Sequence, residues 1–170
     1  MRLMCAAGCA AFAEDEAAVQ MQQNPKYGWR PTGGRETVKT TFSTRSIRMF
    51  GAMSKDRLII SIVDSANSET FQEFLEGIHR DHPKSCMVLD NASCHKSKSI
   101  QKYMESAGDD IAFEFLPPYT PQLNPIETAW RDPKRRPAGR YFRSTEELER
   151  SITTIVKREM GNRLKGYLAV

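Results

Sequence analysis

Apolar residues recur with two different periods along this chain, and the change of period separates a strand-rich first part from a second part that contains helices. Short apolar or alternating runs predict strands over residues 10–19, 37–42, 47–53 and 58–63. The first run is rich in alanine, which is a poor strand former. Because turn residues separate the runs, we expect an antiparallel meander.

Helical spacing begins after residue 68. Ser68 is the expected N-cap of a first helix. The apolar positions that follow it share one helix face: Phe71, Phe74, Leu75 and Ile78. A second helix is expected to stop at Gly108, because glycine commonly ends helices. Its apolar positions are Ile100, Tyr103, Met104 and Ala107.

Two more strands are predicted around the second helix. The apolar run 86–89 ends at Asp90 and fits a buried strand between helices. Alternation over residues 111–115 predicts a strand after the helix. The order of strands, then helix-strand-helix-strand-helix-helix, favours an α/β fold with one mixed sheet and helices packed on it. We therefore assign residues 10–170 to one domain and leave residues 1–9 as an uncertain N-terminal segment.

The last two helices have recognisable start signals. Asn124 is the expected N-cap of the first of them, and Pro125 suits its first helical position. Pro133 then falls inside that helix, where it removes a backbone donor, so a kink or stop near Asp132 is predicted. Residues 144–147 form a capping box for the final helix. That helix is expected to bury Leu148, Ile152, Ile155 and Val156.

Composition narrows the class of protein. No apolar run approaches the roughly 20 residues that a membrane span needs, so no membrane partner and a cytoplasmic, nucleoid-associated location are expected. The four cysteines show neither a CxxC pair nor a zinc-type spacing, and free thiols in a reducing compartment explain them. A metal site at Cys94 with His95 is the alternative for that pair.

The net charge of +4 is mild, but the basic residues are concentrated in two stretches, residues 26–48 and 131–143. Aromatic residues, among them Trp29 and Trp130, lie within or next to both stretches. Basic residues interleaved with aromatic ones favour a phosphate-rich partner. Solvated surface segments, with tryptophans that only pack, are the alternative.

Three acidic residues occupy positions where active sites of α/β proteins gather: Asp15 near the end of a strand, Asp90 as the last residue of one, and Glu127 near a helix start. Three converging carboxylates would repel each other, and a divalent ion such as Mg²⁺ or Mn²⁺ removes that cost. Each also has a structural explanation. Glu127 could complete a capping box with Asn124, Asp90 could form a turn, and residues 14–16 could be a solvated acidic tip.

Two longer motifs resemble those of a known family. Residues 88–97, VLDNASCHKS, are similar to the second catalytic motif of DDE-superfamily transposases of the mariner-like bacterial and archaeal insertion-sequence branch, and residues 116–130, LPPYTPQLNPIETAW, to the third. Asp15-Glu16 with residues 27–33 resembles the first motif and its hairpin. Asp90 and Glu127 are 37 positions apart (127 minus 90), close to the separation in that branch. The resemblance covers residues 12–160.

The resemblance implies a ribonuclease H-like fold in which Asp15, Asp90 and Glu127 bind two Mg²⁺ or Mn²⁺ ions, with Glu14 and Glu16 as alternatives for the first ligand. It implies cleavage and joining of double-stranded DNA at transposon ends and target. We expect supporting roles for Asn91, His95 and Asn124. The expected nucleic-acid-binding residues are Trp29, Arg30, Lys134, Arg135, Arg136 and Arg140.

Two departures from the family leave alternatives open. Members usually carry an N-terminal helix-turn-helix region. We expect the chain to form a homo-oligomer on DNA or to work with a separately encoded helix-turn-helix half. The alternative is that the chain is a truncated, inactive or interfering transposase fragment. Asp132-Pro133-Lys134 also stands where the family prefers an aliphatic residue before the lysine. A ribonuclease H-like nuclease without a role in transposition is the remaining alternative.

Overall fold

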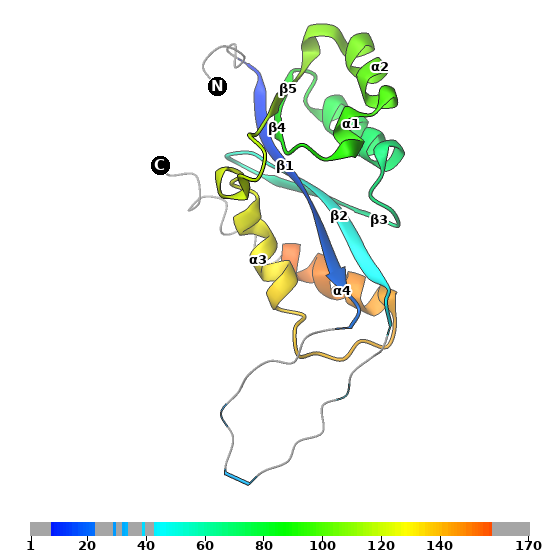
Figure 1. The fold of residues 1–170 in the computed structure, drawn as a ribbon, viewed down its shortest axis with the longest axis vertical. Coiled ribbons are helices and arrows are strands. Elements are labelled where there is room, and N and C mark those ends of the chain that lie inside the picture. The colour runs from blue at the N-terminus through cyan, green and yellow to red at the C-terminus, as the bar shows by residue number, and fades with distance from the viewer. Residues whose placement is uncertain (1–7, 23–28, 30–31, 34–38, 40–42, 158–170) are drawn as a thin grey trace.

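The computed structural model describes residues 8–22, 29, 32–33, 39 and 43–157 and contains one mixed sheet (Figure 1). Its strands are β1 (Ala10–Gln20), β2 (Ser46–Met53), β3 (Leu58–Val63), β4 (Ser85–Leu89) and β5 (Ile111–Phe115). They lie in the order β3-β2-β1-β4-β5. The strand expected over residues 37–42 falls almost wholly outside the described residues.

The central strand β1 joins an antiparallel half of the sheet to a parallel half. β1 runs antiparallel to β2, with Asp15 opposite Gly51, and β2 runs antiparallel to β3. β1 runs parallel to β4, with Ala13 opposite Val88, and β4 runs parallel to β5. The antiparallel pairing expected of the runs 47–53 and 58–63 is therefore confirmed in β2 and β3, and β1 extends it. Because β1, β4 and β5 point the same way, their carboxyl ends face one edge of the sheet.

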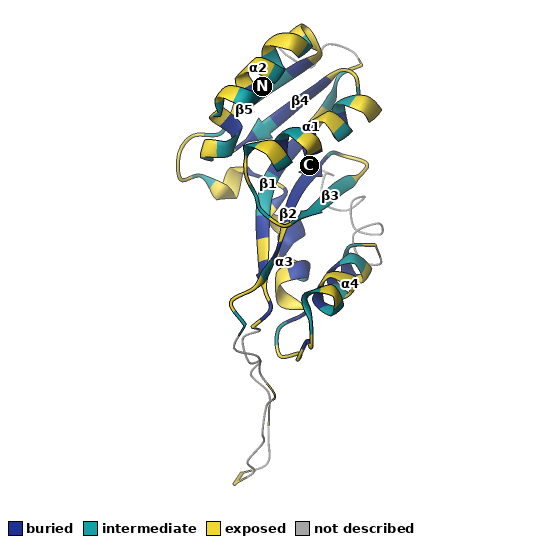
Figure 2. Ribbon diagram, turned by 90° about the vertical axis from the view of Figure 1, so that its right-hand side faces the viewer, coloured by how far each residue is buried: buried dark blue, intermediate teal, exposed yellow. Residues whose placement is uncertain are grey.

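Helices cover both faces of the sheet (Figure 1). They are α1 (Ser68–Asp81), α2 (Lys98–Ala107), α3 (Glu127–Arg135) and α4 (Thr145–Ile155), with short 3₁₀ turns η1 (Ser93–Lys96), η2 (Gly108–Asp110) and η3 (Pro121–Leu123). Strand alternation sends neighbouring residues of β2 to opposite faces: Phe50 packs with α1 and α2, and Met49 packs with α3 and α4. Figure 2 shows buried residues along the strands between these two layers.

The helix starts confirm some sequence predictions and correct others. Ser144 caps α4 by accepting from the Glu147 backbone amide, as predicted, and Leu148, Ile152 and Ile155 are buried while Val156 is only half-buried. The N-cap of α1 is Asn67 and not Ser68. The Asn67 side chain accepts from two backbone amides of the first turn, so it satisfies donors that Ser68, one residue later, could not reach.

Pro133 does not end α3. The helix runs past Asp132 to Arg135, and the Arg136 amide still donates to the Asp132 carbonyl at 2.9 Å, so the predicted stop is wrong. Pro133 is buried, and the burial of its ring offsets part of the cost of the missing backbone hydrogen bond. Among the described residues, none of the helices is both long enough and apolar enough to cross a bilayer.

Candidate active site

Asp15 is held on the sheet by a tryptophan from α3. The indole Nε1 of Trp130 donates to Asp15 Oδ2 at 2.9 Å, and Trp130 itself is fully buried. Gly51, opposite Asp15 on β2, makes room for the indole, because a Cβ at that position would lie 2.5 Å from Trp130 Cη2. The alternative that the tryptophans pack is right for Trp130 and wrong for Trp29, which is fully exposed. The contact of Trp130 with Asp15 could not be read from spacing.

Asp90 follows the last residue of β4 and is tied to the turn after it. The Ala92 backbone amide donates to Asp90 Oδ1 at 2.8 Å, and Nδ1 of His95 lies 3.3 Å from the same oxygen. The neighbouring Asn91 donates from its side chain to the Leu116 carbonyl at 2.7 Å, which ties this turn to the loop after β5. The interpretation of Asp90 as part of a strand-ending turn is therefore confirmed. The turn leaves about half of the Asp90 side chain exposed.

Glu127 is the first residue of α3, and it is exposed. Asn124, the predicted N-cap, does not occupy the cap position of α3. A short turn at residues 124–126 precedes the helix, and the cap residue is Ile126. Asn124 is instead buried, and its side-chain amide donates to the Glu14 carbonyl at 2.7 Å. This bond fixes the entry of α3 against β1. The Asn124 Oδ1 accepts from the Ile126 amide at 3.3 Å and not from that of Glu127, so the alternative of a capping box between Glu127 and Asn124 is wrong.

Asp15, Asp90 and Glu127 line one pocket of about 480 Å³. The pocket lies on the side of the sheet toward which the parallel strands β1, β4 and β5 run. Its other described walls come from Asn91, Ala92, Asn124 and the loop 116–121. No lysine, arginine or histidine is among these lining residues. Burial, followed by repulsion from Glu127 and more weakly from Asp90, raises the pKa of Asp15 to about 6. Glu127 and Asp90 therefore lie close enough to Asp15 to disfavour its charge.

The residues beside Asp15 are not a solvated acidic tip. Glu14 is fully buried, and neither of its carboxylate oxygens has a hydrogen-bond partner among the described residues. Burial and the nearby charges of Asp15, Glu16 and Asp90 raise the pKa of Glu14 well above its usual range. Strand alternation explains the difference: Glu14 and Glu16 project to the face opposite Asp15. The clue in the sequence is that Glu14 falls on the same face as Phe12.

The face opposite Asp15 brings Glu14 and Glu16 to the 3₁₀ turn η1. His95 Nε2 lies 3.3 Å from Glu14 Oε2, and the Cys94 thiol donates to Glu16 Oε1 at 3.0 Å. Burial lowers the pKa of His95, against an opposite effect of Asp90 and Glu16. Burial and the contact with Glu16 raise the pKa of the Cys94 thiol to about 12.

The predicted nucleic-acid-binding residues are on the surface where the structure describes them. Trp29 is fully exposed, and Arg30 lies outside the described residues. Lys134, Arg135 and Arg136, at the end of α3, are exposed. Arg140 is exposed too, and it donates to the Ser151 hydroxyl at 3.3 Å and stacks over the Phe142 ring. Exposure alone does not test whether these residues contact DNA.

Two solved structures share the fold. The crystal structure of the Mos1 strand transfer complex matches with a TM-score of 0.71 at 14% identity, covering 94% of this chain and 50% of that chain. The Mos1 mariner paired-end complex with Mn matches with a TM-score of 0.68 at 15% identity, covering 93% of this chain and 51% of that chain. The ribonuclease H-like mixed sheet that the motifs implied is therefore confirmed.

Sequence comparison identifies the family. The uncharacterized protein y4pE/y4sA of Sinorhizobium fredii (strain NBRC 101917 / NGR234) is 32% identical over 73 residues, which are 41% of this chain and 50% of that protein. The chain thus spans about half the length of the relatives it matches. The family model described as DDE superfamily endonuclease matches residues 12–149, which include Asp15, Asp90 and Glu127. The chain belongs to the DDE superfamily endonuclease family, as its motifs predicted.

Proposed function

We propose that this chain is the catalytic domain of a transposase that cuts and joins DNA strands, with divalent metal ions held by Asp15, Asp90 and Glu127. The observation that carries the proposal is the shared pocket, lined by three carboxylates and by no described cationic side chain. A divalent cation offsets their repulsion, and carboxylate oxygens are the ligands that Mg²⁺ and Mn²⁺ prefer. The donor set therefore fits the metal that the family implies.

Each proposed ligand is oriented by a neighbour of its own. Trp130 holds one oxygen of Asp15, the Ala92 amide holds one oxygen of Asp90, and Asn124 fixes the strand-to-helix approach that brings Glu127 to the pocket. Such preorganisation matters because carboxylates placed in advance need no rearrangement when the reaction begins. Two bound ions supply the activation of the attacking oxygen and the stabilisation of the leaving oxygen.

The proposed DNA contacts are of the backbone type. Lys134 and Arg135 are exposed at the end of the helix that carries Glu127, so they lie on the same element as one of the metal ligands. Exposed cations of this kind bind phosphates without reading sequence. We propose that a helix-turn-helix region from a separately encoded half recognises the element ends. We also propose that the active unit is an oligomer on DNA.

A plasmid-nicking assay tests the proposal. The chain, incubated with supercoiled DNA and Mn²⁺ or Mg²⁺, is expected to convert it to the open circular form, and Glu127→Gln is expected to abolish this conversion. Asp109→Asn is the matched control, because it removes an exposed carboxylate in η2, outside the residues that line the pocket. Nicking that survives removal of metal, or that Glu127→Gln leaves unchanged, would contradict the proposal.

The same assay separates the alternatives. A precut duplex with a free 3′-hydroxyl is expected to be joined to the plasmid by a transposase domain. Nicking without any joining would favour a ribonuclease H-like nuclease instead. Metal binding without nicking or joining would favour an inactive or interfering fragment.

A further inference from the structure

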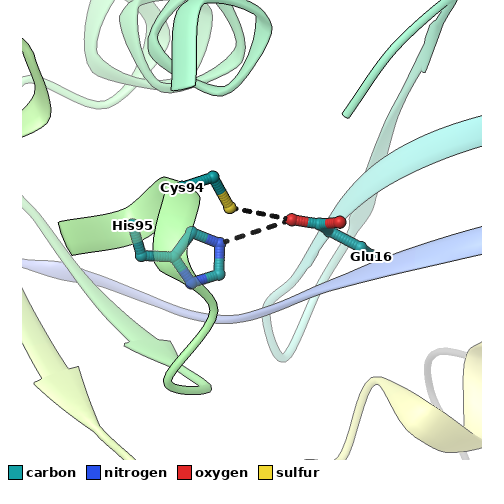
Figure 3. A group of neighbouring side chains, drawn as sticks. All are labelled: Glu16, Cys94 and His95. Carbon is teal, nitrogen blue, oxygen red and sulfur yellow. Dashed lines mark hydrogen bonds and ion pairs between the residues drawn. The ribbon is translucent and has the colours of Figure 1, made fainter. Parts of the chain in front are cut away.

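Four side chains with metal-binding atoms meet on the face of β1 opposite the catalytic pocket. Glu14 and Glu16 come from β1, and Cys94 and His95 come from η1. Figure 3 shows Cys94 and His95 directed toward Glu16. One ligand atom from each of Glu16, Cys94 and His95 lies within 4.8 Å of the other two. None of the four is among the residues that line the catalytic pocket.

Buried polar atoms in this cluster lack partners. Both carboxylate oxygens of Glu14 and Nε2 of His95 are buried, and none of the three has a hydrogen-bond partner among the described residues. Nε2 and Glu14 Oε2 are 3.3 Å apart, but the pair lacks the geometry of a hydrogen bond. Buried polar groups without partners are rare in proteins, so their presence together here indicates a missing binding partner.

The donor atoms indicate which partner. A thiol sulfur, an imidazole nitrogen and a carboxylate oxygen together suit Zn²⁺, whereas Mg²⁺ and Mn²⁺ prefer sites made only of oxygen. A tetrahedral zinc ion with bonds of about 2.0 to 2.3 Å places its ligand atoms roughly 3.3 to 3.8 Å apart. Cys94 Sγ is 3.0 Å from Glu16 Oε1, and His95 Nε2 is 3.9 Å from the same oxygen. Small adjustments bring both separations into that range.

We propose that Glu16, Cys94 and His95 bind a zinc ion, separate from the metal ions of the catalytic pocket, and that Glu14 lies next to its fourth coordination position. On binding, the Cys94 sulfur forms a bond to zinc and its proton leaves to solvent. Glu16 and Cys94 are only part-buried, which leaves the ion a way in. This proposal does not depend on the proposed catalytic function.

The geometry around His95 supports the assignment. With Nε2 on the metal, Nδ1 carries the proton and can donate to Asp90 Oδ1, 3.3 Å away. Histidine ligands of zinc almost always donate their other nitrogen to a carboxylate or carbonyl in this way. The zinc site would therefore act as a structural brace beneath Asp90, and its loss would loosen a proposed catalytic ligand.

Cobalt substitution tests the site directly. Co²⁺ added to the metal-free chain is expected to give the near-ultraviolet thiolate charge-transfer band and the intense visible bands of a tetrahedral site. Zn²⁺ should then abolish both. A variant that keeps Cys94 as its only cysteine (Cys5→Ser, Cys9→Ser, Cys86→Ala) should give the same spectrum, and Cys94→Ser should give no charge-transfer band. Asp15→Asn with Glu127→Gln should leave the spectrum intact, because these changes remove only the proposed catalytic ligands.

Zinc affinity, measured by competition with a chromophoric chelator, supplies the second readout. Removing even a supporting partner of a zinc ligand costs about 10- to 100-fold in affinity, so Cys94→Ser should weaken zinc binding by at least about tenfold. The absence of a cobalt thiolate band in the wild-type chain would overturn the proposal. So would a band that persists in Cys94→Ser, or equal zinc affinity in the wild type and a folded Cys94→Ser protein.

Discussion

Asp15→Asn should stabilise the metal-free protein, and only above a defined pH. The pKa of Asp15 rises from 3.8 to about 6 on folding, because of burial and then of repulsion from Glu127. A carboxyl group whose pKa is raised by folding destabilises the folded state once it is charged. Well below pH 3.8 the side chain is neutral in both states, so the charge has no effect. As the pH rises through 6 the penalty reaches its full value.

The size of the effect follows from the pKa shift. A shift of about two units corresponds to about 3 kcal/mol at most. Asp15 is only half-buried, so screening by solvent reduces the figure to about 1 to 2 kcal/mol. Asparagine keeps an oxygen that can accept from Trp130 Nε1, so the substitution removes the charge without breaking that bond. In a domain of this size the gain corresponds to a rise in Tm of roughly 2 to 8 °C.

Thermal unfolding without metal, followed by circular dichroism at pH 4 and pH 7.5, measures the difference between Asp15→Asn and the wild type. We expect it to be small at pH 4 and clearly larger at pH 7.5. The control Asp109→Asn should show little difference at either pH. Mn²⁺ should stabilise the wild type and close the gap at pH 7.5. A gain that is equal at both pH values, or a loss of stability at pH 7.5, would refute the reasoning.

The remaining predictions concern packing and helix ends, and each is measured as a change in Tm or in urea midpoint. Gly51→Ala should destabilise by about 1 to 3 kcal/mol and disturb Asp15, because its Cβ would meet the buried Trp130 indole at 2.5 Å. Gly77→Ala, in α1 with nothing within 4 Å of the added Cβ, is the control and should stabilise by about 0.5 to 1 kcal/mol. Equal effects at the two glycines would contradict the packing argument. Asn67→Ala should cost about 1 kcal/mol through the lost cap, whereas Ser68→Ala should cost much less. Pro133→Ala should stabilise by about 1 kcal/mol, because it restores a donor for the Ala129 carbonyl at a helical position; unchanged stability would show that packing of the ring offsets the whole penalty.

Local patterns predicted much of the fold, because they reflect forces within single elements. The short apolar run at residues 58–63 predicted β3, and the helical spacing of Phe71, Phe74, Leu75 and Ile78 predicted the buried face of α1. The helix starts were less predictable. Asn67 and Ser68 are both good caps, and only the chain geometry selects between them. Asn124 looks like a cap in sequence, and its Oδ1 does accept from the Ile126 amide, but the turn at residues 124–126 moves the start of α3 to Glu127. The bond from its side-chain amide to the Glu14 carbonyl is a long-range contact that no local pattern shows.

The candidate site was predictable only where motifs carried it. Asp90 and Glu127 stand in long motifs, and Asp15 was chosen from three adjacent acids by resemblance. The structure separates these acids by face, with Asp15 toward the pocket and Glu14 fully buried on the other side. The contact of Cys94 with Glu16 joins residues 78 positions apart in the chain. A pairing of that kind depends on how β1 and β4 align in the sheet, which no local pattern shows.

The central claim is that Asp15, Asp90 and Glu127 hold divalent metal ions, and calorimetric titration with Mn²⁺ tests it most directly. The wild-type chain and Asp109→Asn should bind Mn²⁺ with similar affinity, since Asp109 is outside the residues that line the catalytic pocket. Glu127→Gln should weaken binding strongly while remaining folded, because Glu127 is an exposed residue at a helix start. Equal Mn²⁺ affinity in the wild type and Glu127→Gln would contradict the account.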